Sequence, residues 1–201
     1  IQTGMGKTGR MFACDHWDVV PDMLCVGKGF AAGFGPMSAM LTRPDIADVF
    51  RSPGHEFRHG YTYAGHPVSA AAALAVLDII EREGLVEHAR RMGEYLVGKL
   101  APLLQYPIVG DVRGLGLLQA VELVSDRQTK VPLEPAGVVG GFVRDFCYQR
   151  GMILRNNGDI LVLAPPLIVT EGIIDELVGN IEAAVVAALS APEIRPLIAA
   201  S

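Results

Sequence analysis

The hydrophobic pattern of the chain changes at Pro67, and this change limits the folds that the sequence can adopt. Residues 1–66 are rich in glycine and predicted loops. From Pro67 apolar residues recur at helical spacing through residues 69–83, until Gly84 ends the helix. Before this helix, short strands are expected at residues 24–26 and 38–41.

Strands and helices alternate in the remainder of the chain. The predicted elements are a helix over 85–104, two strands within 108–124, a helix over 137–149, a strand pair at 152–154 and 160–163, and a helix over 171–189. This alternation predicts an α/β protein in which a small α/β domain follows the tail of a larger domain.

Charge and composition exclude several classes of partner. The chain has 17 basic and 22 acidic residues and no basic run, so we expect no nucleic-acid partner. Half of the residues are hydrophobic, yet no apolar run approaches the ~20 residues that span a bilayer, so we expect no membrane insertion. Cys14, Cys25 and Cys147 lie far apart, which predicts neither a disulfide framework nor a metal site and favours a cytoplasmic protein.

Two short motifs suggest other functions but lack the context that those functions need. Residues 4–9 fit G-x-G-x-x-G, but no helix is predicted after them, and Ile1 stands where a P-loop needs glycine. Residues 55–59 read H-E-x-x-H, but Pro53 and Gly60 leave no room for the helix of a zinc site. We therefore predict a turn beside a pocket at residues 4–9, and no zinc at residues 55–59.

Lys28 is the strongest candidate for a catalytic residue. It follows a mostly apolar predicted strand and lies between Gly27 and Gly29. An amine at the end of an apolar strand loses hydration, which favours its neutral form and makes it a candidate Schiff-base nucleophile. The alternative is a lysine whose stem packs while its amine reaches water.

Four segments of the sequence resemble class III aminotransferases, which are pyridoxal-phosphate enzymes of fold type I. They are residues 1–13 (IQTGMGKTGRMFA), Pro21-Asp22 leading to Gly27-Lys28-Gly29, residues 59–67 (HGYTYAGHP) and residues 111–116 (DVRGLG). The resemblance implies the C-terminal part of a large cofactor-binding domain at 1–84, an interdomain helix at 85–106 and a small C-terminal α/β domain at 107–201. Residues 61–67 and 155–159 look most like the omega-amino acid or amine:pyruvate branch.

The resemblance also implies roles for particular residues. Lys28 matches the lysine that bonds to pyridoxal 5'-phosphate and shuttles protons, and Gln2 matches a hydrogen-bond partner of the cofactor's phenolic oxygen. Tyr61, through its backbone, and Thr62 match a segment that reaches the cofactor phosphate of the neighbouring subunit, which implies a homodimer or a tetramer. The other interpretation of Thr62 is an ordinary helix cap.

Arg155 is the candidate for binding the substrate carboxylate. It matches the mobile arginine of the amine:pyruvate branch, which turns inward to grip an amino or keto acid and outward to admit a hydrophobic amine. A branch typified by ornithine aminotransferase has its arginine just before the motif at residues 164–166, where this chain has Leu161, Val162 and Leu163. We expect Arg113 to order its own turn instead of touching substrate.

The predicted function is transamination between an amine or omega-amino acid and pyruvate or a similar keto acid. The family aspartate that bonds the pyridine nitrogen would fall just before Ile1, so we expect this chain alone to be inactive. Alternatives are an aminomutase or decarboxylase of the same fold, or a truncated dimerisation module without activity.

Overall fold

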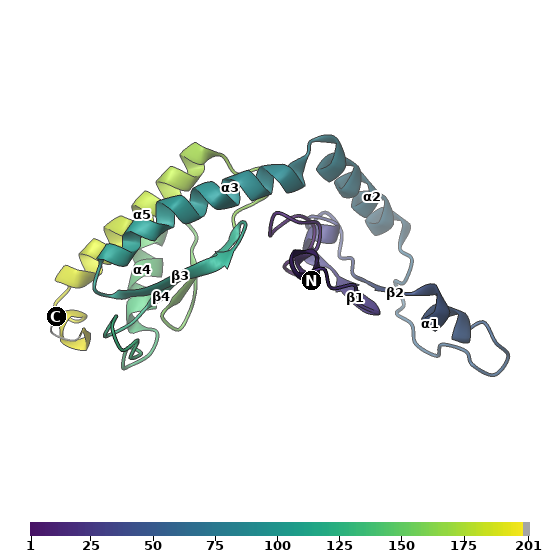
Figure 1. Cartoon of the computed structure of the whole chain (residues 1–201), viewed down its shortest axis with the longest axis horizontal. Helices are drawn as coiled ribbons and strands as arrows, with labels where there is room; N and C mark the ends of the chain where they lie inside the picture. Colours follow the sequence, from purple (N-terminus) through teal and green to yellow (C-terminus); the bar gives the residue numbers. More distant parts are fainter. Residues whose placement is uncertain (199–201) are drawn as a thin grey trace. The chain divides into compact units, whose positions relative to one another are not determined.

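The computed structural model describes residues 1–198, which form two compact units (Figure 1). The first unit spans Ile1–Glu87 and the second begins at His88. Among the described residues, none of the helices combines the length and the apolar character needed to cross a membrane.

The first unit contains a small sheet and one long helix. Its elements are η1 (Ala13–Trp17), β1 (Met23–Val26), η2 (Lys28–Phe30), β2 (Ala39–Thr42), α1 (Pro44–Val49) and α2 (Pro67–Arg82). Strands β1 and β2 pair antiparallel, with Cys25 opposite Met40. The strands expected at 24–26 and 38–41 are therefore confirmed to within one residue, whereas the short helix α1 is not predicted.

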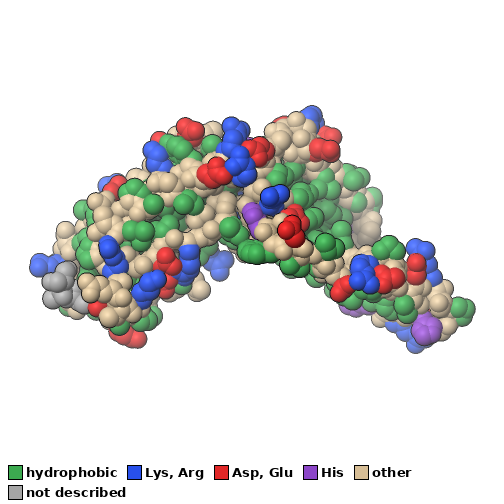
Figure 2. Space-filling view, in the orientation of Figure 1, with side chains coloured by type: hydrophobic (Ala, Val, Ile, Leu, Met, Phe, Trp, Pro, Cys, Tyr) green, Lys and Arg blue, Asp and Glu red, His purple; other side chains and the backbone are tan. Residues whose placement is uncertain are grey.

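Helix α2 begins and ends where the sequence indicates. Pro67 occupies its first turn, the ring nitrogen Nδ1 of His66 accepts a hydrogen bond from the backbone N–H of Ser69 at 3.4 Å, and Gly84 follows with φ +61°. Its surface carries exposed apolar side chains, including Val68 and Leu74, and Figure 2 shows such side chains gathered around this helix.

The second unit is a four-stranded antiparallel sheet with three long helices. The chain runs through α3 (Leu85–Leu100), which starts just before the unit boundary, then η3 (Ala101–Gln105), β3 (Val109–Leu115), β4 (Leu118–Leu123), α4 (Val138–Gln149), β5 (Arg155–Asn157), β6 (Ile160–Leu163), α5 (Glu171–Ser190) and η4 (Arg195–Leu197). The strand order is β3-β4-β6-β5. A mixed α/β architecture is thus confirmed.

The hydrophobic core of the second unit joins its helices to its sheet. Leu96 from α3, Leu161 from β6 and Ile181 from α5 are all fully buried in one cluster. Helices α3 and α5 lie side by side (Figure 1), where Tyr95 donates a hydrogen bond to Asp175 at 2.9 Å. The sheet is therefore stabilised by packing against α3 and α5 as well as by the hydrogen bonds between its strands.

Two predicted boundaries in this unit are wrong. The strand expected at 152–154 lies instead at β5, because the hairpin turns at Gly158 and Asp159, after Asn157 pairs with Ile160. The helix expected over 85–104 ends as α-helix at Leu100, and a 3-10 segment that contains Pro102 follows. Proline has no N–H to continue the helical hydrogen bonds.

Candidate active site

Lys28 stands at the end of β1 in a strained backbone conformation. Its φ is +49°, in the left-handed region that side chains other than glycine rarely adopt, and this costs about 1–3 kcal/mol. The turn packs closely against Met5, because a Cβ added at Gly29 would lie 3.3 Å from the Met5 Cβ. The packing of the glycine-rich segment therefore helps to place the Lys28 turn.

The structure brings Lys28 and Gln2 together. The Lys28 amine donates a long hydrogen bond of 3.5 Å to Oε1 of Gln2, and both side chains are exposed. The loss of hydration expected at Lys28 is therefore not found in this chain. Among residues 1–198 strand β1 pairs only with β2, and although its last residue Val26 is buried, the side chain of Lys28 two residues later is exposed.

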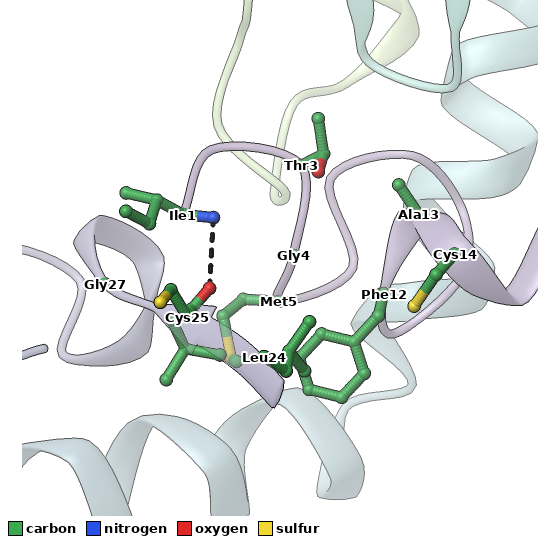
Figure 3. A pocket seen from close by; sticks show the side chains of 11 residues that line it. Ile1, Thr3, Gly4, Met5, Phe12, Ala13, Cys14, Leu24, Cys25 and Gly27 are labelled. Carbon is green, nitrogen blue, oxygen red and sulfur yellow. Dashed lines mark hydrogen bonds between the residues drawn. The ribbon is translucent and has the colours of Figure 1, made fainter. Parts of the chain in front are cut away.

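A cavity of about 180 Å³ lies beside Ile1 and Thr3, the two neighbours of Gln2 in the sequence (Figure 3). Ile1 and Thr3 line it, and Gln2 between them does not, so the Gln2 amide points away from it and toward Lys28. Its other walls are largely apolar and come from Gly4, Met5, Phe12, Ala13, Cys14, Leu24, Cys25, Val26 and Gly27. The cavity therefore belongs to the packing beside the candidate site and not to its chemistry.

Tyr61 and Thr62 lie in an exposed turn before α2. The carbonyl of Tyr61 accepts a hydrogen bond from the N–H of Ala64 at 3.0 Å. The cap of α2 is His66, so the interpretation of Thr62 as an ordinary helix cap is wrong. Within residues 1–198 no hydrogen bond joins either residue to Lys28 or Gln2, and their predicted role toward a neighbouring subunit stays a prediction.

The two short motifs that suggested other functions do not form the corresponding sites. Residues 4–9 form turns closed by His16, whose Nε2 lies 3.1 Å from the carbonyl of Thr8, and the short 3-10 helix η1 follows them in place of an α-helix. Burial lowers the pKa of the Lys7 amine in this loop. Residues 55–59 have no helical structure, so His55 and His59 do not share a helix face.

Arg155 is the first residue of β5 and is exposed. It pairs with Val162 of β6, and its guanidinium makes no ion pair within the described part of the chain. Arg113 differs, because it binds Glu122 and, at 3.2 Å, Asp111, and the hydrogen bond to Glu122 raises the pKa of its guanidinium. Arg113 therefore links strands β3 and β4, in agreement with a structural role.

Comparison with known proteins finds one matching family over most of the chain. The family described as Aminotransferase class-III matches residues 1–185. An adenosylmethionine-8-amino-7-oxononanoate aminotransferase of Nitratidesulfovibrio vulgaris is 43% identical over 190 residues, which cover 93% of this chain and 35% of that protein. A putrescine–pyruvate aminotransferase of Pseudomonas aeruginosa is 36% identical over 176 residues, which cover 87% of this chain and 38% of that protein.

Solved structures agree with these sequence matches. An amine transaminase from an uncultivated Pseudomonas species, in a PLP-bound form, matches with a TM-score of 0.88 and 42% identity over 92% of this chain and 43% of that chain. An omega transaminase of Pseudomonas jessenii in complex with PMP matches with a TM-score of 0.88 and 38% identity over 94% of this chain and 42% of that chain. The chain thus spans about two fifths of the length of the proteins that it matches.

Proposed function

The chain belongs to the class III aminotransferases, with the α/β fold of part of a fold type I enzyme, and from this we propose that the whole protein is a pyridoxal-phosphate-dependent aminotransferase. It transfers an amino group between an amine or omega-amino acid and pyruvate or a similar keto acid. The observation that carries the proposal is the pairing of the Lys28 amine with the Gln2 amide at the end of β1. The two relatives are named after different amino donors, so the comparisons do not specify the amino donor of this protein.

The residues at this end of β1 fit one edge of the cofactor. Pyridoxal phosphate, when bound, supplies the aldehyde and the electron sink for the reaction. Lys28 offers an exposed primary amine that can bond to that aldehyde. Once the substrate has displaced Lys28, its amine holds and returns the proton that moves during transfer of the amino group. Gln2 uses Oε1 toward Lys28, which leaves its Nε2 to donate to a phenolic oxygen.

Tyr61 and Thr62 are proposed to bind the cofactor phosphate of a second subunit. Support comes from their exposed turn, which precedes the N-terminus of α2 and offers a hydroxyl and backbone N–H groups. The proposal therefore includes a homodimer or a tetramer in the cytoplasm. The proposal also assigns residues 1–84 to the large domain, 85–106 to the interdomain helix and 107–201 to the small domain.

Arg155 is proposed to bind the carboxylate of the amino or keto acid. A planar guanidinium binds a carboxylate through two parallel hydrogen bonds. Arg155 is exposed and makes no ion pair within residues 1–198, so its charge is not neutralised by a neighbouring carboxylate in this part of the chain. Arg113, which binds Glu122 and Asp111, lacks this freedom.

Steady-state kinetics of the full-length enzyme test this assignment. Arg155→Ala should reduce kcat/KM for pyruvate roughly tenfold to a hundredfold, because a hydrogen bond to a charged group contributes about 1.5–3 kcal/mol. The value for a carboxylate-free amine such as 1-phenylethylamine should change little. Arg113→Ala is the matched control and should leave the ratio of the two values unchanged. Equal losses for both substrates in Arg155→Ala would refute the role of Arg155.

A further inference from the structure

The hairpin that carries Arg155 is short and braced by its own side chains. Asn157 pairs with Ile160, so only Gly158 and Asp159 form the turn, and Gly158 has φ +58°. The Asn156 amide nitrogen donates a 2.8 Å hydrogen bond to the Gly158 carbonyl. The turn therefore has a defined shape, which the Asn156 side chain supports.

Asp159 ties this hairpin to the first turn of α4. Its side chain is buried, with 8% of the residue exposed. Oδ2 accepts a hydrogen bond from the Gly137 N–H at 2.6 Å, and Oδ1 accepts one from the Gly140 N–H at 2.8 Å. Helix α4 has no capping side chain at its own N-cap residue, so Asp159 supplies the cap from another part of the chain.

Gly140 allows α4 to lie directly against the hairpin. A Cβ at this position would stand 2.3 Å from the Gly158 carbonyl oxygen and 3.0 Å from the Asp159 Cα, and both of these are backbone atoms. No side-chain rotation relieves such a clash, so an alanine here would push the hairpin and the helix apart. Gly141 is different, because its nearest contact would be the end of the Arg144 side chain at 4.0 Å.

The side of the hairpin that faces α4 is opposite to the side that carries Arg155. A Cβ at Gly140 would lie 3.2 Å from Nδ2 of Asn156, so Asn156 faces the helix. Successive side chains of a strand point to opposite faces, and Arg155 is exposed. The hairpin is thus clamped to α4 on one face and presents Arg155 on the other.

We propose that Asp159 is a positioning residue for Arg155, and that Asp159 and Gly140 together fix the backbone from which the guanidinium reaches the substrate carboxylate. This inference rests on the proposed role of Arg155.

The test uses the full-length enzyme loaded with cofactor, assayed with pyruvate and with 1-phenylethylamine. Gly140→Ala and Asp159→Asn should raise the KM for pyruvate about tenfold while kcat stays within about twofold. The reason is that a small displacement of the Arg155 guanidinium strongly weakens its binding of the pyruvate carboxylate. The values for the amine should stay near those of the parent. Gly141→Ala is the matched control, since it adds the same methyl group to the same helix without touching the hairpin.

A double-mutant cycle separates positioning from general damage. When Arg155 is already alanine, Gly140→Ala should have no further effect on the KM for pyruvate, because the group that it displaces is absent. An equal effect in both backgrounds, or equal KM increases in Gly140→Ala and Gly141→Ala, would overturn the inference and leave the role of Arg155 standing. A uniform loss in Arg155→Ala itself would overturn the role of Arg155 and the inference with it.

A milder variant covers the case in which Gly140→Ala or Asp159→Asn does not fold. Asn156→Ala truncates a partly exposed side chain and removes only its bonds to the Gly158 carbonyl and to Arg144. It should raise the KM for pyruvate in the same direction by about twofold to fivefold, because hydrogen bonds of the Asn156 side chain are lost while the Asp159 cap of α4 is kept. An unchanged KM in this variant, with Arg155→Ala selective, would contradict the inference.

Discussion

Lys28 and Met5 both have positive φ and are linked through Gly29, which packs against the Met5 side chain. Met5 is buried with 5% exposure and lies in the glycine-rich segment that resembles a nucleotide-binding loop. Strained residues persist only where the surrounding packing holds them, and they gather at functional sites. The glycine-rich segment thus contributes to the site as a packing base for the Lys28 turn.

Cys147 should make the stability of the chain fall at high pH. Burial in α4 raises the pKa of its thiol from 9.0 to about 11. The folded state then holds the proton more tightly than the unfolded state, so this contribution is present below pH 9 and is lost as the pH rises toward 11. Urea unfolding at pH 8, 9, 10 and 11 should show a decline that Cys147→Ala reduces.

Cys25, whose side chain is exposed, provides the control for this experiment. Cys25→Ala, measured in the same way, makes the same substitution at an exposed thiol. Parallel curves for Cys147→Ala and the parent chain would show that the buried thiol is not a source of the decline.

At the scale of elements, α3 should be sensitive to a methyl group at one glycine and tolerant at another. A Cβ at Gly93 would lie 2.4 Å from the Cα of Gly116, in the turn between β3 and β4, whereas a Cβ at Gly98 meets nothing within 4 Å. Gly93→Ala should therefore destabilise the chain by roughly 1–3 kcal/mol, as overpacking does. Gly98→Ala should stabilise it by up to about 1 kcal/mol through helix propensity.

Denaturant unfolding of the two variants beside the parent chain measures both effects. Because the substitution is the same and both sites are in α3, any difference between them reports the contact with the β3–β4 turn. Stabilisation by both variants would mean that α3 does not approach this turn as closely as the structure has it.

Long helices and the larger strands could be predicted from the sequence because their signals are local. Pro67, Gly84 and Gly151 mark helix ends by backbone restrictions that act within a few residues. The strand expected at 152–154 is absent, because apolar residues alone do not decide pairing: Ile153 is exposed and none of the three residues joins the sheet. Leu154 is indeed buried, yet the ladder begins one residue later at Arg155.

Only those residues of the candidate site that lie in recognisable motifs could be predicted from the sequence. The proximity of Lys28 and Gln2 agrees with the cofactor-binding roles that the family resemblance implies for both residues. The role of Asp159 as the cap of α4 could not be predicted from the sequence, because its partners Gly137 and Gly140 lie 22 and 19 residues earlier. The exposure of Lys28 fits the alternative interpretation of this residue, in which its amine reaches water, and not the expected loss of hydration.

At the scale of the whole molecule, the two units differ in how much apolar surface they bury. The described core cluster, from Ala89 to Ile194, lies in the second unit. The first unit buries few large apolar side chains, mainly Met5, Val26 and Ile80. Since burial of apolar area is the main source of stability, the second unit should be the more stable one.

Hydrogen exchange of the 201-residue chain, followed by mass spectrometry of peptides, measures this difference. Peptides from β4 and α5 should exchange much more slowly than peptides from β1 and β2, because the latter open without disturbing the core. Equal protection in the two units would contradict the assignment of the core to the second unit alone.

The central claim, that this chain carries the catalytic lysine of an aminotransferase at Lys28, has a direct chemical test. The full-length protein is loaded with pyridoxal phosphate, reduced with borohydride, digested and mapped by mass spectrometry. We predict a pyridoxyl group on Lys28, with Lys7 unmodified, and no label at position 28 in Lys28→Ala. A pyridoxyl group on another lysine, with Lys28 unmodified, would contradict the account.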